Sequence, residues 1–205
     1  MAKSVDNNSG TRDHILRAAL KRFAHAGYAA TSVQQIVGDA KVSKPALYYH
    51  FHDKAGLYQA LVNEAQDERY RLMHEAAARA SEPRAQLVEI IAALFEYFND
   101  NRELMRLSLA TIFASPGELP EGLRHIEKGT RNFEFIHSLM KQALKSGALN
   151  GGFDSRELAF GFYGQINSYM MANLLIPGCR LNRPTAEHIV DLFMTGAGAK
   201  KKSRR

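Results

Sequence analysis

The stretch from Lys44 to His50 gathers side chains that can recognise a polyanion. On a helix, Leu47 and Phe51 would point toward a core, which leaves a polar and aromatic face made of Lys44, Ala46, Tyr48, Tyr49 and His50. Such a face fits the major groove of DNA, where the first residues of a recognition helix meet base edges and the surrounding side chains meet phosphates. The residue types therefore favour nucleic-acid recognition at this stretch.

Other spacings could carry catalysis or hold a metal, but each is incomplete. Ser138 and Lys141 have the S-x-x-K spacing of acyl enzymes without the partner motifs that this chemistry needs. His74-Glu75 begins like a zinc-protease helix, yet position 78 is alanine. His50-Phe51-His52-Asp53 could hold a metal ion, although His50 already belongs to the polar face. We expect no catalytic residue, no metal and no cofactor.

The elements that must position the polar face can be located from caps and periodicity. Apolar residues predict a helix from about Thr11 or Arg12 to His25, with Gly27 beyond its end. Thr31 or Ser32 would cap a second, short helix, and Ser43 a third that carries Pro45 in its first turn. Helices this short are marginal alone, so they must pack on the first helix and on the next one. The two short helices and their three-residue link predict a helix-turn-helix.

This arrangement resembles the tetracycline-repressor (TetR) family of bacterial regulators. The resemblance is closest over residues 12–62 and is carried by one ordered set of positions: Phe23, Gly27-Tyr28, Thr31-Ser32-Val33, Ile36, Val42-Ser43, Leu47-Tyr48, His50-Phe51, Lys54 and Leu57. The family commonly has glycine in the turn, where this chain has Lys41. A non-glycine residue in the left-handed conformation costs about 1 kcal/mol, and the lysine could add a phosphate contact.

The resemblance implies a role for each matching residue. Thr31 or Ser32 would hold a phosphate at a helix N-terminus, and Gln34 would lie near a base edge or the backbone. Lys44 would donate to guanine, while Pro45 and Ala46 would contact thymine methyls. Phosphates would be bound or flanked by Tyr48, Tyr49, His50 and Lys54. Thr31 and Ser43 could instead be helix caps only, and Tyr49 could be a surface packing residue.

Charge and cysteine content support a nucleic-acid partner in a reducing compartment. The net charge is +6, and the excess of Lys and Arg lies in the first 60 residues and in the last six. Each cation placed on a phosphate adds affinity by releasing counterions. The single cysteine, Cys179, cannot form an internal disulfide. We expect a cytoplasmic protein that does not cross a membrane.

The remainder of the chain is predicted to be helical as well, giving an all-α protein of about nine helices. A long helix should follow the cap Asp53 and end near Arg79, with later helices at about 84–99, 102–114, 121–146, 155–176 and 185–195. We expect a DNA-binding domain at 1–55 with a flexible arm at 1–10. A ligand-binding and dimerisation domain would follow at 56–198, and a basic disordered tail at 199–205.

The helix predicted at 155–176 is apolar nearly all round, so both of its sides must be covered. Leu158, Phe162, Ile166 and Tyr169 form one stripe, and Ala159, Tyr163, Met170 and Leu174 another. The resemblance implies that the last two helices pair with those of a second copy. Such a homodimer would place two recognition helices about 34 Å apart on a palindromic operator.

The resemblance also implies a pocket for a small-molecule inducer of unknown identity. The candidate lining is rich in aromatic residues and methionine, as ligand cavities often are: Phe95, Met105, Phe113, Phe133, Met140, Phe162, Tyr163, Asn167 and Met170. The same spacing also fits plain core packing. The favoured hypothesis is a repressor that an apolar inducer releases from DNA, and the alternative is a helical binding or scaffold protein that no longer binds DNA.

Overall fold

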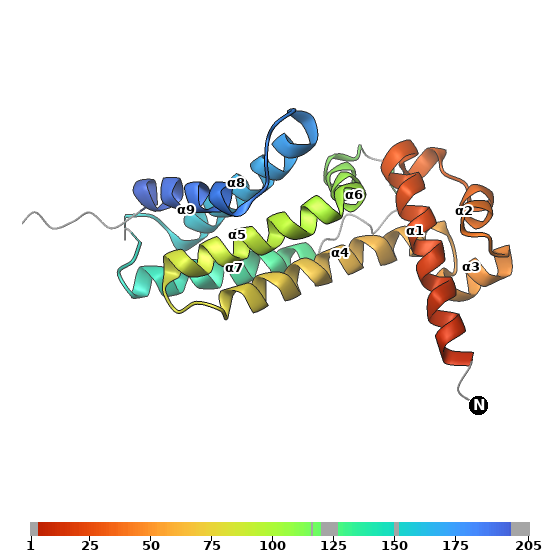
Figure 1. Cartoon of the computed structure of the whole chain (residues 1–205), viewed down its shortest axis with the longest axis horizontal. Coiled ribbons are helices and arrows are strands. Elements are labelled where there is room, and N and C mark those ends of the chain that lie inside the picture. The colour runs from red at the N-terminus through yellow and green to blue at the C-terminus, as the bar shows by residue number, and fades with distance from the viewer. Residues whose placement is uncertain (1–3, 116, 120–126, 150–151, 198–205) are drawn as a thin grey trace, which may run out of the picture. The chain divides into compact units, whose positions relative to one another are not determined.

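The computed structural model describes residues 4–115, 117–119, 127–149 and 152–197, and over these the chain is all-α, as predicted. Its nine helices, drawn in Figure 1, are α1 (Ser4–Ala30), α2 (Val33–Ala40), α3 (Lys44–Phe51), α4 (Lys54–Ala77), α5 (Pro83–Asp100), α6 (Arg102–Phe113), α7 (Glu127–Lys145), α8 (Ser155–Leu175) and α9 (Arg183–Ala197). Among the described residues, no helix is long and apolar enough to cross a membrane.

The helices group into two compact units. The first comprises Met1–Ala65 with Arg102–Ile126, and the second Gln66–Asn101 with Glu127–Arg205. The division between the units falls inside α4, because Leu57, Tyr58, Leu61 and Val62 are buried in the core of the first unit. The domain boundary at residue 55 stays a prediction.

The first unit packs α2, α3, α6 and the beginning of α4 around α1. Its core joins the apolar faces of these five helices: Ile15, Leu16, Ala19, Phe23, Ile36, Val37, Leu47, Phe51, Leu57, Leu61 and Leu107. The Tyr58 hydroxyl lies 2.7 Å from the Thr111 hydroxyl, and burial raises the pKa of Tyr58. The short helices α2 and α3 thus gain their stability from packing, as helices of this length must.

The first helix begins earlier than predicted, but its regular helical geometry is interrupted at Gly27, where the sequence predicted its end. It begins at Ser4, so residues 4–10 of the expected flexible arm are helical, and residues 1–3 lie outside the described part. Adding a turn to an existing helix needs no new nucleus, which explains the extension. Gly27 leaves helical geometry at φ 79°, the positive φ that glycine adopts at the end of a helix.

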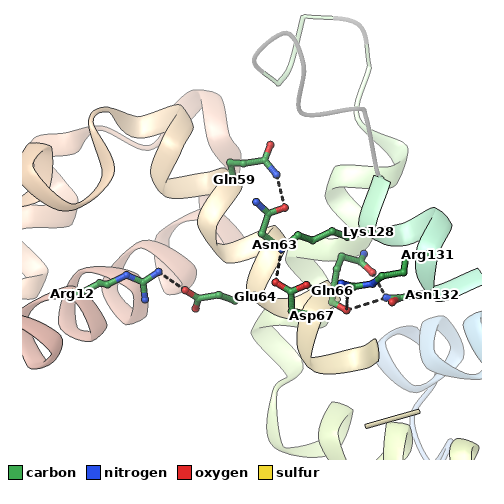
Figure 2. Close-up of polar contacts among 9 residues, drawn as sticks. All are labelled: Arg12, Gln59, Asn63, Glu64, Gln66, Asp67, Lys128, Arg131 and Asn132. Atoms are coloured by element: carbon green, nitrogen blue, oxygen red, sulfur yellow. Dashed lines mark hydrogen bonds and ion pairs between the residues drawn. The ribbon is translucent and has the colours of Figure 1, made fainter. Parts of the chain in front are cut away.

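The second unit packs α5 against α9 and α7 against α8. Ile90, Ile91, Leu94, Phe162 and Ile189 are buried in it. Exposed ion pairs join α5 and α9, namely Arg84–Asp191 and Arg183–Glu89. Figure 2 shows that Asp67 of α4 accepts from Lys128 and Arg131 of α7, and that Asn132 donates to Gln66. The expected tail at 199–205 lies outside the described residues.

The residues predicted to line a pocket are divided between the units. Met105 and Phe113 belong to α6 of the first unit, where Met105 is buried and Phe113 is 72% exposed. The others lie in the second unit, where Phe95, Met140, Phe162 and Met170 are buried and Phe133, Tyr163 and Asn167 are half-buried. Packing in the core accounts for the buried members, so their role toward a ligand stays a prediction.

Candidate nucleic-acid interface

Helix α2 is started by a reciprocal pair of hydrogen bonds. The backbone N–H of Gln35 donates to Ser32 Oγ at 3.2 Å, and the backbone N–H of Ser32 donates to Gln35 Oε1 at 2.8 Å. This capping box satisfies two N–H groups that the first turn leaves free. Of the two predicted caps, Ser32 is therefore the one used, and Gln34 stays exposed beside it.

The link between α2 and α3 turns at a left-handed residue. Lys41 has φ 54° and ψ 43°, and its N–H donates to Gly38 O, while the Val42 N–H donates to Val37 O at 3.1 Å. These two bonds form the Schellman arrangement that commonly ends a helix, usually with glycine at the left-handed position. The lysine therefore occupies a conformation that disfavours a side chain.

Replacing Lys41 by glycine should stabilise the fold by about 0.5–1 kcal/mol, because the relief of left-handed strain exceeds the entropic cost of glycine. Urea unfolding of the two proteins measures the difference. The control variant Lys21→Gly, in the middle of α1, should instead lose about 1 kcal/mol. Equal losses in both variants would show that the Lys41 backbone stores no strain.

Helix α3 presents the polar face that the sequence predicted. Ser43 Oγ accepts the Ala46 N–H at 3.3 Å, and Pro45 stands in the first turn where its missing donor is not needed. Leu47 and Phe51 are buried. The other side of the helix carries exposed or half-buried side chains: Lys44, Pro45, Ala46, Tyr48, Tyr49 and His50. Of the two tyrosines, Tyr48 and Tyr49, the second is the more accessible, at 73% exposure.

The junction of α3 with α4 is tight and holds α3 in place. The Asp53 N–H donates to Phe51 O at 2.7 Å across His52, which has φ 62° and ψ −48°. This is a γ-turn, a strained conformation for a non-glycine residue. Asp53 Oδ1 then accepts the Gly56 N–H at 2.7 Å, as expected of an N-cap. A Cβ on Gly56 would lie 2.2 Å from Phe51 O.

Two residues predicted to contact phosphates are committed to contacts within the fold. Lys54 Nζ donates to the carbonyl oxygens of Tyr28 and Thr31, both at 2.9 Å, and lies 4.1 Å from the Tyr28 ring centroid. Burial lowers the pKa of Lys54. Thr31 is buried, and its hydroxyl donates to Gly27 O at 2.8 Å. Both residues therefore join the end of α1 to the starts of α2 and α4.

A cationic cavity beside α2 was not anticipated from the sequence. It has a volume of about 790 Å³ and is lined on α1 by His14, Arg17, Lys21, Arg22 and His25, together with Asp39 and Lys41. Arg22 is paired with Asp39 at 2.5 and 2.8 Å, and this hydrogen bonding lowers the pKa of Asp39. The spacing of His14, Arg17, Lys21 and His25 by three or four residues is a signal in the sequence that could have revealed this stripe.

Comparison with known proteins finds one family model that matches part of the first unit. Residues 15–61 match the family model described as bacterial regulatory proteins, tetR family. The HTH-type transcriptional regulator AcrR of Shigella flexneri is 27% identical over 181 residues, covering 85% of this chain and 83% of that protein. YuxN of Bacillus subtilis, an uncharacterized HTH-type transcriptional regulator, is 30% identical over 95 residues. That match spans 46% of this chain and only 33% of the length of YuxN.

Solved structures share the fold of this chain. The transcriptional regulator FadR from Bacillus subtilis, solved in complex with stearoyl-CoA, superimposes with a TM-score of 0.77 at 18% identity, over 90% of this chain and 98% of that chain. The predicted helix-turn-helix positions fall within the matched residues 15–61, and the named relatives are regulators rather than enzymes. Residues 15–61 therefore form a domain that matches the tetR family of bacterial regulatory proteins, and the chain is similar to HTH-type transcriptional regulators.

Proposed function

We propose that the protein is a cytoplasmic homodimeric repressor, which binds a palindromic operator through α3 and leaves it when a small molecule binds in the second unit. The observation that carries the DNA-binding part is the exposed face of α3. That helix is fixed by the Ser43 cap, by buried Leu47 and Phe51 and by the Gly56 junction, while Lys44 and Pro45 at its start are free to reach base edges. Base readout requires a rigidly held helix whose polar side-chain ends can reach the bases.

Within this proposal the side chains of the first unit have different tasks. Lys44, Pro45 and Ala46 would read bases, with Gln34 near a base or the backbone. Ser32, Ser43, Tyr48, Tyr49 and His50 would meet phosphates or flank them. Lys54 and Thr31, whose polar atoms are used inside the unit, act mainly by positioning α2 and α4. The cationic cavity on α1 would add attraction to phosphates without reading sequence.

The dimer part of the proposal is supported by apolar side chains left exposed on the last two helices. On α8 these are Phe160, Met171 and Leu175, at 61%, 39% and 72% exposure, and on α9 Leu192 is 63% exposed. The three α8 residues are separated by eleven and by four residues, spacings that place them on one face of a helix. Of the two stripes predicted on this helix, Leu158, Phe162 and Ile166 of one and Ala159 and Met170 of the other are buried within the chain.

The ligand part is supported by the second unit and by one relative. FadR from Bacillus subtilis has been crystallised with stearoyl-CoA. In the present chain, buried Phe95, Met140 and Phe162 with half-buried Phe133, Tyr163 and Asn167 provide apolar surface and a few polar groups. We therefore propose an apolar inducer that binds there.

A gel-shift titration tests the DNA-binding proposal, using the DNA that flanks the gene of this protein. We expect a discrete complex whose affinity falls steeply, by orders of magnitude, between about 50 and 200 mM salt. No complex at low salt without inducer would contradict the proposal and would favour a binding or scaffold role.

The Lys44→Ala variant should bind the operator more weakly by about 1–3 kcal/mol and should lose discrimination at one base pair of each half-site. Anisotropy titrations on the operator and on single-base variants measure both effects. The control variant Lys145→Ala, exposed at the end of α7, should leave affinity and discrimination unchanged. If the Lys44→Ala variant discriminated between base pairs as well as wild type, Lys44 would not be a base-reading residue.

A further inference from the structure

The second unit contains a buried arginine whose charge no described carboxylate balances. Arg69 of α4 is 7% exposed, and its Nε and Nη2 atoms have no hydrogen-bond partner in the described part of the chain. No described carboxylate lies within ion-pair distance of it. A buried charge without a partner is expensive, so such a group normally accompanies an anion.

The neighbouring carboxylates on α4 are already paired with other cations. Asp67 accepts from Lys128 and Arg131, and both interactions lower the pKa of Asp67 (Figure 2). Glu68 accepts from Arg71 at 2.8 and 2.5 Å. The carboxylates next to Arg69 in sequence are therefore already held by other side chains.

Aromatic rings hold the guanidinium of Arg69 in place. Its Cζ atom lies 5.5 Å from the ring centroid of Phe98 on α5 and 5.4 Å from that of Tyr163 on α8. Both contacts are in the range of cation–π attraction, which positions a cation but satisfies none of its N–H donors. The rings thus fix the guanidinium between three helices while the Nε and Nη2 donors stay unused.

The unused edge has the geometry that binds a carboxylate. In the same molecule, Arg22 holds the Asp39 carboxylate through Nε and Nη2, and Arg71 holds Glu68 through the same two atoms. Arg69 presents this pair of donors inside the second unit, with no acceptor on it. A planar, two-oxygen anion completes it in the same way.

Acceptors without donors also occur in this unit. Asn132 is fully buried and donates to Gln66, one helical turn before Arg69, but its Oδ1 atom has no partner among the described residues. Gln165 Oε1 on α8 is likewise buried, and no described residue donates to it. Native proteins rarely leave buried polar atoms unpaired, so these acceptors of the second unit need donors beyond those of the described residues.

We propose that Arg69 is the anchor for the carboxylate of an acidic, otherwise apolar ligand that binds in the second unit. The inference rests on the proposed function and deepens it, since it assigns the ligand an anionic head group and names the side chain that holds it. Phe98 and Tyr163 orient the guanidinium, and the carboxylate occupies its Nε and Nη2 edge.

Binding of matched probes to the purified full-length protein, in the absence of DNA, tests this assignment. Decanoate and decan-1-ol share a chain length and differ in head group. By isothermal titration, decanoate should bind wild-type protein roughly 10- to 100-fold more tightly than decan-1-ol. Equal affinity for the two probes, or no decanoate binding, would overturn the proposal.

The variants Arg69→Met and Arg71→Met separate a ligand anchor from a structural cation. Arg69→Met should abolish the preference for decanoate and, without ligand, should keep or raise the melting temperature, because it removes an unbalanced buried charge. Arg71→Met, an exposed control two residues along α4, should keep the preference. An Arg69→Met protein that retains the preference would contradict the proposal.

Should Arg69→Met fail to fold, Arg69→Lys provides the second variant. It keeps the charge without the two-pronged edge and should bind decanoate with affinity between those of wild type for the two probes. An Arg69→Lys protein with wild-type decanoate affinity would show that the edge is not the anchor. Because these experiments use no DNA, their failure leaves the DNA-binding proposal standing, and failure of operator binding leaves the ligand assignment standing.

Discussion

The Gly56→Ala variant is expected to lose about 2–3 kcal/mol of folding free energy and most of its operator affinity. A Cβ at this position would lie 2.2 Å from Phe51 O, which is backbone and cannot rotate away. Either α3 or the first turn of α4 must move, and overpacking of this kind lowers the free energy of unfolding by about 1–3 kcal/mol. Because Phe51 ends the helix that carries Lys44 and Tyr48, the displacement also misplaces the proposed base-reading face. Urea unfolding and gel-shift titration measure the two effects.

The matched control is Gly38→Ala in α2. Gly38 is helical, and a Cβ there would meet nothing within 4 Å. The variant should gain about 0.5–1 kcal/mol from helix propensity and bind the operator normally. If Gly56→Ala behaved like Gly38→Ala, the α3–α4 junction would not be the support that the geometry indicates.

The Leu175→Arg variant is expected to convert the protein to a monomer and to weaken operator binding by roughly 100-fold or more. Leu175 is 72% exposed on the α8 face shared with Phe160 and Met171, so its replacement leaves the core of the second unit intact. An arginine on this face of each copy would put like charges into the proposed interface. A monomer binds one half-site only and therefore loses the gain in affinity that comes from binding both half-sites, which is about 10²- to 10⁴-fold. Sedimentation velocity and gel shift measure the two consequences.

Gln142→Arg provides the control for charge alone. Gln142 is exposed on α7 rather than on α8, and its replacement adds the same group to the same unit. This variant should remain dimeric and bind the operator like wild type. A Leu175→Arg protein that also stayed dimeric would rule out the α8 face as the interface.

The first unit could largely be predicted from the sequence because its signals are local. Ser32, Ser43 and Asp53 cap helices by contacts that reach only three residues along the chain. Pro45 and Gly27 have backbone requirements that do not depend on distant parts. The left-handed Lys41 was also foreseeable, since the position of the turn fixes the conformation and the residue type does not change it.

The contacts that the sequence did not reveal join residues far apart in the chain. Tyr58 meets Thr111 because α6 returns to pack on the first unit, and no local pattern specifies that return. Lys54 was assigned to a phosphate by the family resemblance, but the nearby carbonyls of Tyr28 and Thr31 accept two of the hydrogen bonds that its ammonium can donate. A charged residue offers no periodic signal that it will be buried, so Arg69 escaped notice.

The second unit was predictable in secondary structure and less so in which faces are covered. Helix α8 is apolar nearly all round, and such a sequence does not show which stripe meets the chain itself. Packing on α7 and α9 buries Leu158, Ala159, Phe162 and Met170. Only the structure shows that Phe160, Met171 and Leu175 are the ones left exposed.

Hydroxyl-radical footprinting of the dimer on its operator tests the central claim most directly. If two α3 helices read one palindrome, two protected regions should appear, related by a twofold axis and centred about one helical turn, roughly 34 Å, or a multiple of it apart. Lys44→Ala should weaken protection equally in both halves. A single asymmetric footprint, or two footprints that Lys44→Ala leaves unchanged, would contradict this account.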